Sequence, residues 1–158
     1  MHQHLYVNRI KKYFRMIIRG LEYLHDKQGY VHCNLKPKNI LIASDDTVRI
    51  SNFKSCLEPY EYQDESIIAT LIKPPGFDYK SRIGFDLDSW QVGLALIYVC
   101  CGPYPENLNP QDLLEFFERN IQMEDYKEFR PILEQKLLQT DNKKRLWGKN
   151  LPIAADDA

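Results

Sequence analysis

The chain has 158 residues, of which 44% are hydrophobic and 27% charged, and these fractions are those of a soluble globular protein. This length fits a single domain with one hydrophobic core. The formal net charge is −1, which excludes the strong positive charge that steers proteins to nucleic acid or acidic membranes. We therefore expect neither a nucleic acid nor a membrane as a partner.

Four cysteines, Cys33, Cys56, Cys100 and Cys101, show no CxxC spacing and no set of histidine ligands near them. We expect them to be reduced, which indicates an intracellular, cytoplasmic protein. The sequence opens without the pattern of a secretory signal peptide. The longest apolar run, residues 92–101, is too short to span a membrane and suits a buried helix.

The first predicted element is a helix over residues 11–27, because apolar residues recur there at helical spacing. Gly29 is placed to end it in the left-handed conformation. Two short apolar runs, residues 40–42 and 48–50, predict a small β-hairpin. We interpret the aspartates at 45–46 between them as turn residues, not as catalytic carboxylates.

Residues 54–82 show no clear period and contain several prolines, which predicts a long irregular segment that is functional or mobile. The clearest helix follows, with Asp88 as its expected N-cap, Gln91 three residues later and Gly102 at its end. This helix is apolar nearly all round, so it should be buried on every side. We expect it to be the central post of the domain.

Two shorter helices are predicted farther on, the first capped by Asn109 and the second opened by Pro131. Residues 147–158 lack a helical apolar period and should form a loose tail. The pattern as a whole predicts a mostly helical domain with one or two small hairpins.

Four motifs, in this order, resemble those of the C-terminal, or large, lobe of the eukaryotic protein kinase superfamily. Residues 32–39 read His-Cys-Asn-Leu-Lys-Pro-Lys-Asn, where the family's catalytic loop has His-Arg-Asp-Leu-Lys-Pro-x-Asn. Residues 52–54, Asn-Phe-Lys, stand at the family's metal-binding Asp-Phe-Gly. Residues 88–93, Asp-Ser-Trp-Gln-Val-Gly, are similar to Asp-x-Trp-Ser-x-Gly, and residues 138–145 resemble a late segment that ends in an arginine, here Arg145.

The resemblance implies a mainly α fold of the α+β kinase superfamily, with a small β-hairpin in the catalytic-loop region. It assigns residues 1–146 to an incomplete kinase domain and leaves 147–158 as the tail. The family's N-terminal lobe, with its glycine-rich ATP loop, has no counterpart here, since no G-x-G pair occurs. We expect no cofactor, with ATP and magnesium bound only if an N-terminal lobe is supplied. The surface that this lobe covers in the family should be exposed.

The resemblance places amides at two catalytic positions. Asn34 takes the place of the aspartate that accepts the substrate proton or orients the hydroxyl, and an amide cannot take up a proton at neutral pH. Losing such a base costs on the order of 100- to 10,000-fold in rate. Asn52 takes the place of the magnesium-binding aspartate, and a neutral amide loses the main attraction to the ion. The site should therefore be catalytically poor and hold no metal, although Lys36 and Asn39 are retained.

Other residues acquire structural roles from the resemblance. His32 should pack below Phe53, and both are expected to belong to the core. Asp88 should accept backbone hydrogen bonds from the catalytic loop. Asn39 is expected to order the loop backbone more than to hold a metal. Lys36 fits a phosphate contact and a surface charge equally well.

Further departures concern regulation. Cys33 replaces the arginine that pairs with a phosphate in many family members. Its thiol is interpreted as a core group, with a reactive thiol near lysines as the alternative. Gly76 stands at the place of a family glutamate. Arg145 matches the arginine that pairs with that glutamate in the family, so it should lack this ion pair here. We expect residues 54–76 to be less firmly docked than in an active kinase.

Three hypotheses of function follow. The first is a catalytically impaired, pseudokinase-like lobe that binds or regulates a protein partner in signalling, either an active kinase or its substrate. The alternative is a fragment or subunit of a protein Ser/Thr kinase that transfers phosphate from ATP to protein, with its N-terminal lobe elsewhere. Lys36 favours the Ser/Thr over the Tyr branch. The third is a decayed gene product without a selected function.

Overall fold

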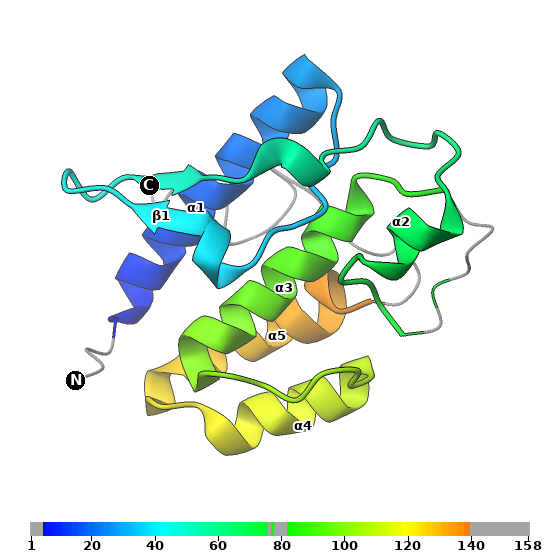
Figure 1. Cartoon of the computed structure of the whole chain (residues 1–158). Helices are drawn as coiled ribbons and strands as arrows, with labels where there is room; N and C mark the ends of the chain where they lie inside the picture. The colour runs from blue at the N-terminus through cyan, green and yellow to red at the C-terminus, as the bar shows by residue number, and fades with distance from the viewer. Residues whose placement is uncertain (1–4, 76, 78–81, 140–158) are drawn as a thin grey trace.

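The structure is a computed structural model that describes residues 5–75, 77 and 82–139, and every structural statement below refers to these residues. The described part contains helices arranged around a central one, with a two-stranded antiparallel sheet at their side (Figure 1). The prediction of a mainly α domain with a small β-hairpin is confirmed. The α-helices and strands are Val7–Tyr23 (α1), Ile40–Ile42 (β1), Val48–Ile50 (β2), Glu65–Ala69 (α2), Asp86–Cys101 (α3), Pro110–Asn120 (α4) and Arg130–Ile132 (α5).

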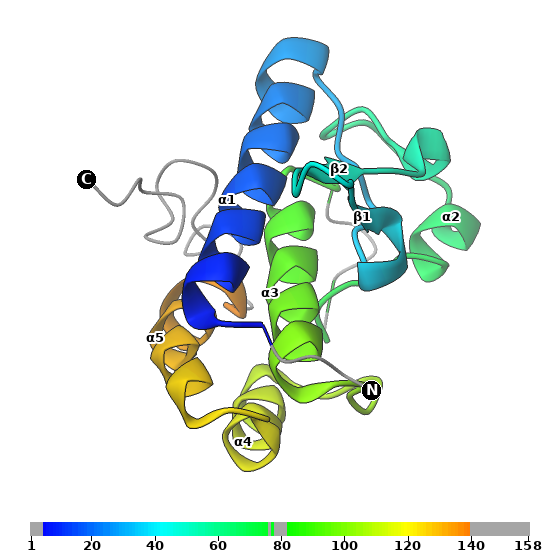
Figure 2. The same ribbon diagram turned by 90° about the vertical axis from the view of Figure 1, so that its left-hand side faces the viewer.

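Helix α1 confirms the first predicted helix, although it begins four residues earlier than expected. It continues into a π-helical turn, Leu24–Gln28, and ends at Gly29, whose φ of 73° is the expected left-handed stop. Its apolar stripe is buried in the main core, which includes Ile10, Phe14 and Leu21. Figure 2 shows the N-terminal part of α1 beside α3, with the C-terminal part of α1 extending past the start of α3.

Helix α3 is the central post that the sequence predicts, because twelve of its 16 residues are buried. It ends at Gly102, at a φ of 86°, as expected. The prediction of Asp88 as its N-cap is wrong. The helix begins at Asp86 with Phe85 in the N-cap position, and the Asp88 carboxylate is turned toward the loop at residues 31–39.

Helices α4 and α5 close one end of the domain (Figures 1 and 2). Asn109 caps α4 as predicted, since its side chain accepts a hydrogen bond from the Asp112 N–H at 2.9 Å. Pro131 lies in the first turn of α5, which begins at Arg130, follows the 3-10 helix Glu124–Phe129 and continues into the π-helical turn Leu133–Leu137. This last turn packs closely on Gly93 of α3.

The hairpin has the predicted strands, with Ile40 paired to Ile50 and Ile42 to Val48. Its turn is held on α1 by Asp46, whose carboxylate accepts hydrogen bonds from Arg9 at 2.9 Å and Lys12 at 2.7 Å, and also from Tyr13. Together with the positive φ of Asp46, this confirms that the aspartates serve the turn.

The segment after the hairpin is more ordered than its composition predicts. Asp64 caps the short helix α2, which periodicity did not reveal. Leu57 pairs with Val31, and Ile68 is buried in a second small cluster. The predictions that involve Gly76, Arg145, the domain boundary at 146 and the tail fall outside the described residues.

Two general findings bear on the sequence predictions. In the described ranges, no helix has both the length and the apolar character needed to cross a membrane. All four cysteines lie in the described part of the chain, and none of them forms a disulfide there.

Candidate functional site

The candidate site is the loop of residues 31–39, between the end of the first helical element and β1. It lies against the N-terminal half of α3, which supplies the polar side chains that hold it (Figure 1). A 3-10 turn, Pro37–Asn39, leads from the loop into the hairpin. Rigid elements on both sides therefore fix the loop backbone.

Asp88 is the buried anchor of this loop. Its two carboxylate oxygens accept the His32 N–H at 2.9 Å and the Cys33 N–H at 3.0 Å, which is the role that the resemblance implies. Sequence reasoning missed a third partner, His25, whose Nε2 lies 2.7 Å from the same carboxylate. Both side chains are almost fully buried. A lone histidine at the end of a helix carries no motif that could have revealed this contact.

Gln91 is a second anchor that sequence reasoning did not identify. Its Oε1 accepts the Leu35 N–H at 2.8 Å, and its Nε2 donates to the Cys33 and Ile72 carbonyls, each at 2.9 Å. The side chain is fully buried. The sequence did contain a signal, namely a polar residue on a helix that is apolar nearly all round. It was interpreted as part of a capping box at the start of the helix.

His32 is completely buried and bonded on both ring nitrogens. Nδ1 accepts the Asn34 N–H at 3.2 Å, so the proton sits on Nε2, which donates to the Ser51 carbonyl at 3.0 Å. The edge of the ring contacts Phe53, with centroids 5.3 Å apart. This geometry suits a structural role, because neither nitrogen is left to accept a substrate proton.

Phe53 is not a core residue, so that part of the prediction is wrong. Its side chain is 52% exposed. The chain enters a 3-10 turn at this point, Phe53–Ser55, which follows Asn52 in the left-handed conformation. The turn places the Phe53 ring against His32 on one side and leaves the rest of the ring in contact with solvent.

The three asparagines of the site are linked through the loop backbone. The Asn39 side-chain amide donates to the Asn34 carbonyl at 2.7 Å, and the Asn39 carbonyl accepts the Ser51 N–H at 2.8 Å. Asn39 thereby orders the loop, as expected. Asn52, next to Ser51, has a φ of 64°, a region that asparagine tolerates better than most residues.

These residues do not fit the magnesium and ATP that the kinase resemblance implies. The amides of Asn39 and Asn52 offer neutral oxygens, whereas magnesium bound between phosphates prefers carboxylates. In the part of the chain that the structure describes, no group of three or more His, Cys, Asp or Glu side chains could hold a metal ion. The degenerate magnesium and ATP positions therefore stay predictions.

Cys33 lies in the loop with a φ of 70° and is 2% exposed. Burial raises the pKa of its thiol far above the ordinary value, so the thiol stays protonated. Its Sγ lies 3.6 Å from the Val31 carbonyl. These observations favour the core interpretation over a reactive thiol.

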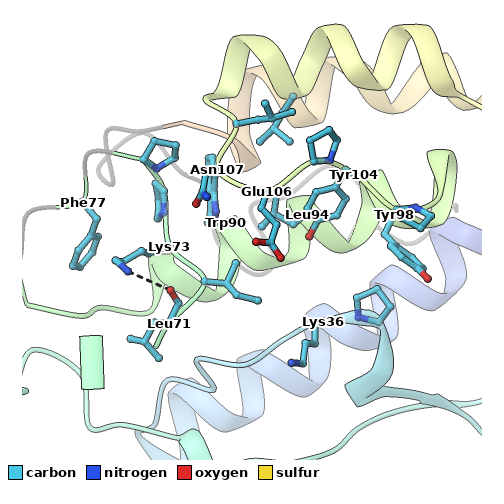
Figure 3. Close-up of a pocket in the computed structure, with 18 residues that line it drawn as sticks. Lys36, Leu71, Lys73, Phe77, Trp90, Leu94, Tyr98, Tyr104, Glu106 and Asn107 are labelled. Atoms are coloured by element: carbon cyan, nitrogen blue, oxygen red, sulfur yellow. Dashed lines mark hydrogen bonds between the residues drawn. The ribbon is translucent and has the colours of Figure 1, made fainter. Parts of the chain in front are cut away.

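A cavity of about 680 Å³ opens beside the loop (Figure 3). Half-buried Lys36 enters it from the loop side, and Trp90, Leu94 and Tyr98 enter it from α3. Residues 71–75 form another wall. Lys36 is thus positioned to meet an anionic or polar group in the cavity, while the neighbouring surfaces are largely apolar.

The hairpin side of the site exposes large apolar side chains. Leu41 and Ile42 of β1 are 51% and 55% exposed, and Phe53 shortly after β2 is exposed to a similar extent. Leu41 and Ile42 are successive strand residues and project to opposite faces, so the exposed apolar groups lie on both faces of the hairpin.

Comparisons with known proteins agree with the motifs. The family model "Protein kinase domain" matches residues 1–150 of the chain. The chain is 28% identical over 149 residues to maternal embryonic leucine zipper kinase of Xenopus tropicalis, covering 88% of the chain and 22% of that protein. It is 35% identical over 133 residues to serine/threonine-protein kinase stk11 of Xenopus laevis, covering 78% and 29% respectively. It is 38% identical over 102 residues to serine/threonine-protein kinase STK11 of Rattus norvegicus, covering 59% and 23%.

The chain thus spans less than a third of the length of each of these relatives. The family match, in contrast, takes in nearly all of its 158 residues. The motifs, the helical architecture around a central buried helix and the family match lead to one conclusion. This chain belongs to the protein kinase domain family.

Proposed function

We propose that this chain is a catalytically impaired, pseudokinase-like member of its family that acts by binding a protein partner. The observation that carries the proposal is the pairing of an intact scaffold with neutral catalytic positions. Asp88, Gln91 and His32 are fully buried and hydrogen-bonded, whereas Asn34 and Asn52 occupy the places of the two family aspartates.

The chemistry of phosphoryl transfer supports this proposal. Such transfer depends on positioning and on metal ions that neutralise charge, and the protein's carboxylates supply most of the metal binding. An amide at Asn34 cannot act as a base, and an amide at Asn52 binds magnesium weakly. Binding of protein requires neither carboxylate.

The exposed apolar side chains indicate where a partner would bind. Leu41, Ile42 and Phe53 are each more than half exposed. Burying side chains of this kind in an interface yields about 25 cal/mol for each Å² of apolar surface removed from water. We propose that the partner is an active kinase or a kinase substrate that covers this hairpin surface.

The test is affinity capture from an extract of the organism that encodes the chain, followed by reconstitution with the purified candidate. Wild type should recover a kinase or a kinase substrate. Leu41→Glu and Phe53→Glu should each weaken reconstituted binding by at least about tenfold, because a charge would be buried in an apolar contact. Tyr62→Glu is the matched control, since Tyr62 is 78% exposed on the segment after the hairpin and should leave binding unchanged.

Two outcomes would contradict the proposal. One is the recovery of neither a kinase nor a kinase substrate. The other is a thermal shift with ATP that requires magnesium, because ligand binding stabilises a protein by mass action. Lack of a magnesium-dependent shift is the expected result for wild type.

A second candidate is a fragment or subunit of a protein Ser/Thr kinase. The retained Lys36 at the cavity and the similarity to serine/threonine-protein kinases favour it. The test is transfer of radiolabelled phosphate from ATP to protein by the product of the full-length transcript. Signal no greater than that of an Asn34→Ala control would end this reading.

A further inference from the structure

The Gln91 side chain joins three parts of the fold that are far apart in the sequence. It projects from α3, bonds the loop at Cys33 and Leu35, and bonds the Ile72 carbonyl in the segment after α2. Each of the three distances is 2.8 or 2.9 Å, which is ordinary for a well-formed hydrogen bond. The Gln91 side chain has no exposed surface, and its two bonds to the loop are buried, whereas the bond to Ile72 is part-buried.

The partners define how the amide must be oriented. Two carbonyls lie at the Nε2 end, which has two N–H donors, and one N–H group lies at the Oε1 end, which is an acceptor. A flipped amide would face the two carbonyls with oxygen. The site therefore requires both donors and the acceptor of a glutamine.

The bond to Ile72 reaches a wall of the cavity. Residues 71–75 line that cavity, and the side chain of Ile72 is 38% exposed. Nearby backbone bonds stay within the segment, since the Leu71 N–H binds the Ile68 carbonyl and the Phe77 N–H binds the Pro74 carbonyl. The Gln91 bond differs from these because it ties the segment to α3 and, through the same amide, to the loop.

We propose that Gln91 is a positioning residue that docks the cavity wall at residues 71–75 onto the candidate-site loop. The same side-chain amide bonds both the loop and the wall, so that displacement of either one changes the hydrogen bonds that hold the other. The link between the loop and the wall is thus made by a neutral side chain. The proposal goes beyond the proposed function, because it concerns the shape of the cavity and requires no partner.

Substitution of Gln91 by glutamate separates this role from simple filling of space. An ionised carboxylate still accepts the Leu35 N–H but presents oxygens to the Cys33 and Ile72 carbonyls, so the wall should detach. A protonated carboxyl has one O–H donor and restores part of the contact. Burial raises the pKa of a carboxyl, so the switch between the two forms should fall within an accessible pH range.

The experiment is hydrogen–deuterium exchange on the purified protein, with each variant compared with wild type at the same pH. In Gln91→Glu, the amides of Leu71 and Phe77, which are bonded to the Ile68 and Pro74 carbonyls, should exchange about tenfold faster than wild type near pH 8, the effect of losing about one hydrogen bond. Near pH 5.5 most of that difference should disappear. Wild type measured at each pH is the control for effects of pH that do not depend on the substitution, since Asp88, His25 and His32 lie near the site.

Gln91→Met is the second variant, because it keeps the length of the side chain and removes its hydrogen bonds. It should show faster exchange at the Leu71 and Phe77 amides at both pH values. Exchange equal to wild type in Gln91→Met would overturn the proposal, and so would acceleration in Gln91→Glu that is the same at both pH values. If Gln91→Glu does not fold near pH 8, the Gln91→Met result decides. No partner is needed for this measurement, so its failure is distinct from failure to find a partner.

Discussion

Replacing Asp88 with asparagine should destabilise the candidate-site loop more than the same substitution at an exposed aspartate would destabilise the protein. The carboxylate is fully buried and accepts the N–H groups of His32 and Cys33, with His25 Nε2 2.7 Å from Oδ2. Asparagine has nearly the same shape but one acceptor oxygen and one donor group. Whichever way the amide is turned, one backbone N–H of the loop faces another donor.

The cost follows from these contacts. A buried donor left without an acceptor costs about 1–3 kcal/mol, and bonds to a charged acceptor are stronger than those to an amide. Burying an amide requires less desolvation than burying a carboxylate, which offsets part of the loss. We expect a net decrease of about 2–4 kcal/mol in the free energy of unfolding of Asp88→Asn, out of a total that is usually about 5–15 kcal/mol.

Urea unfolding near neutral pH measures this change. With a slope of about 2 kcal/mol per molar, the midpoint should fall by roughly 1–2 M. Hydrogen exchange should show the His32 and Cys33 amides opening more than those of α4. The control is Asp26→Asn, an exposed site at which the same chemical change should cost less than about 0.5 kcal/mol. An unchanged midpoint together with unchanged protection of Cys33 would refute the reasoning.

Three further predictions concern other contacts. Gly93→Ala should lower the free energy of unfolding by about 1–2 kcal/mol, because the new Cβ would lie 3.1 Å from the Leu137 Cβ. Gly20→Ala should be neutral or stabilising by up to about 1 kcal/mol, since only the tip of the Ile50 side chain is close. Urea unfolding distinguishes the two variants, and equal effects would contradict the packing argument. Hydrogen bonds from Lys12, Tyr13 and Arg9 hold the pKa of Asp46 below its usual range, so wild type should be more stable than Asp46→Asn near pH 7. That difference should shrink as the pH falls below about 4, and a difference that grows on acidification would have the wrong sign. Cys33 should react with iodoacetamide in the native protein at least tenfold more slowly than in urea, as measured by mass spectrometry, and equal rates would show that its thiol is accessible.

Local patterns predicted much of the fold because local contacts create them. The stripe of α1, the strands around the turn at 45–46 and the cap of α4 at Asn109 all depend on residues close in sequence. Helix α2 was missed because its five residues are too few to display a period, although Asp64 is a typical cap.

The misassigned residues are those whose partners lie far away in the sequence. Asp88 and Gln91 have the spacing of a capping box, but both side chains bond the loop more than 50 residues earlier. Phe53 was expected in the core from the kinase resemblance, yet it is half-exposed beside the hairpin. A sequence pattern ranks local interactions well, whereas the competition between a local cap and a distant backbone N–H is decided by tertiary packing.

The hydrogen bonds that hold the loop bear on the proposed function. They come from Asp88, Gln91, the Asn39 side-chain amide and the His32 ring, and the bonds that the last two make with Asn34 involve its backbone. Clustered carboxylates repel each other unless a cation lies between them, so aspartates at 34 and 52 would favour a metal-bound state. Amides at these positions remove that requirement. The loop can then keep its conformation without an ion, as the proposed role of the chain in binding a protein partner requires.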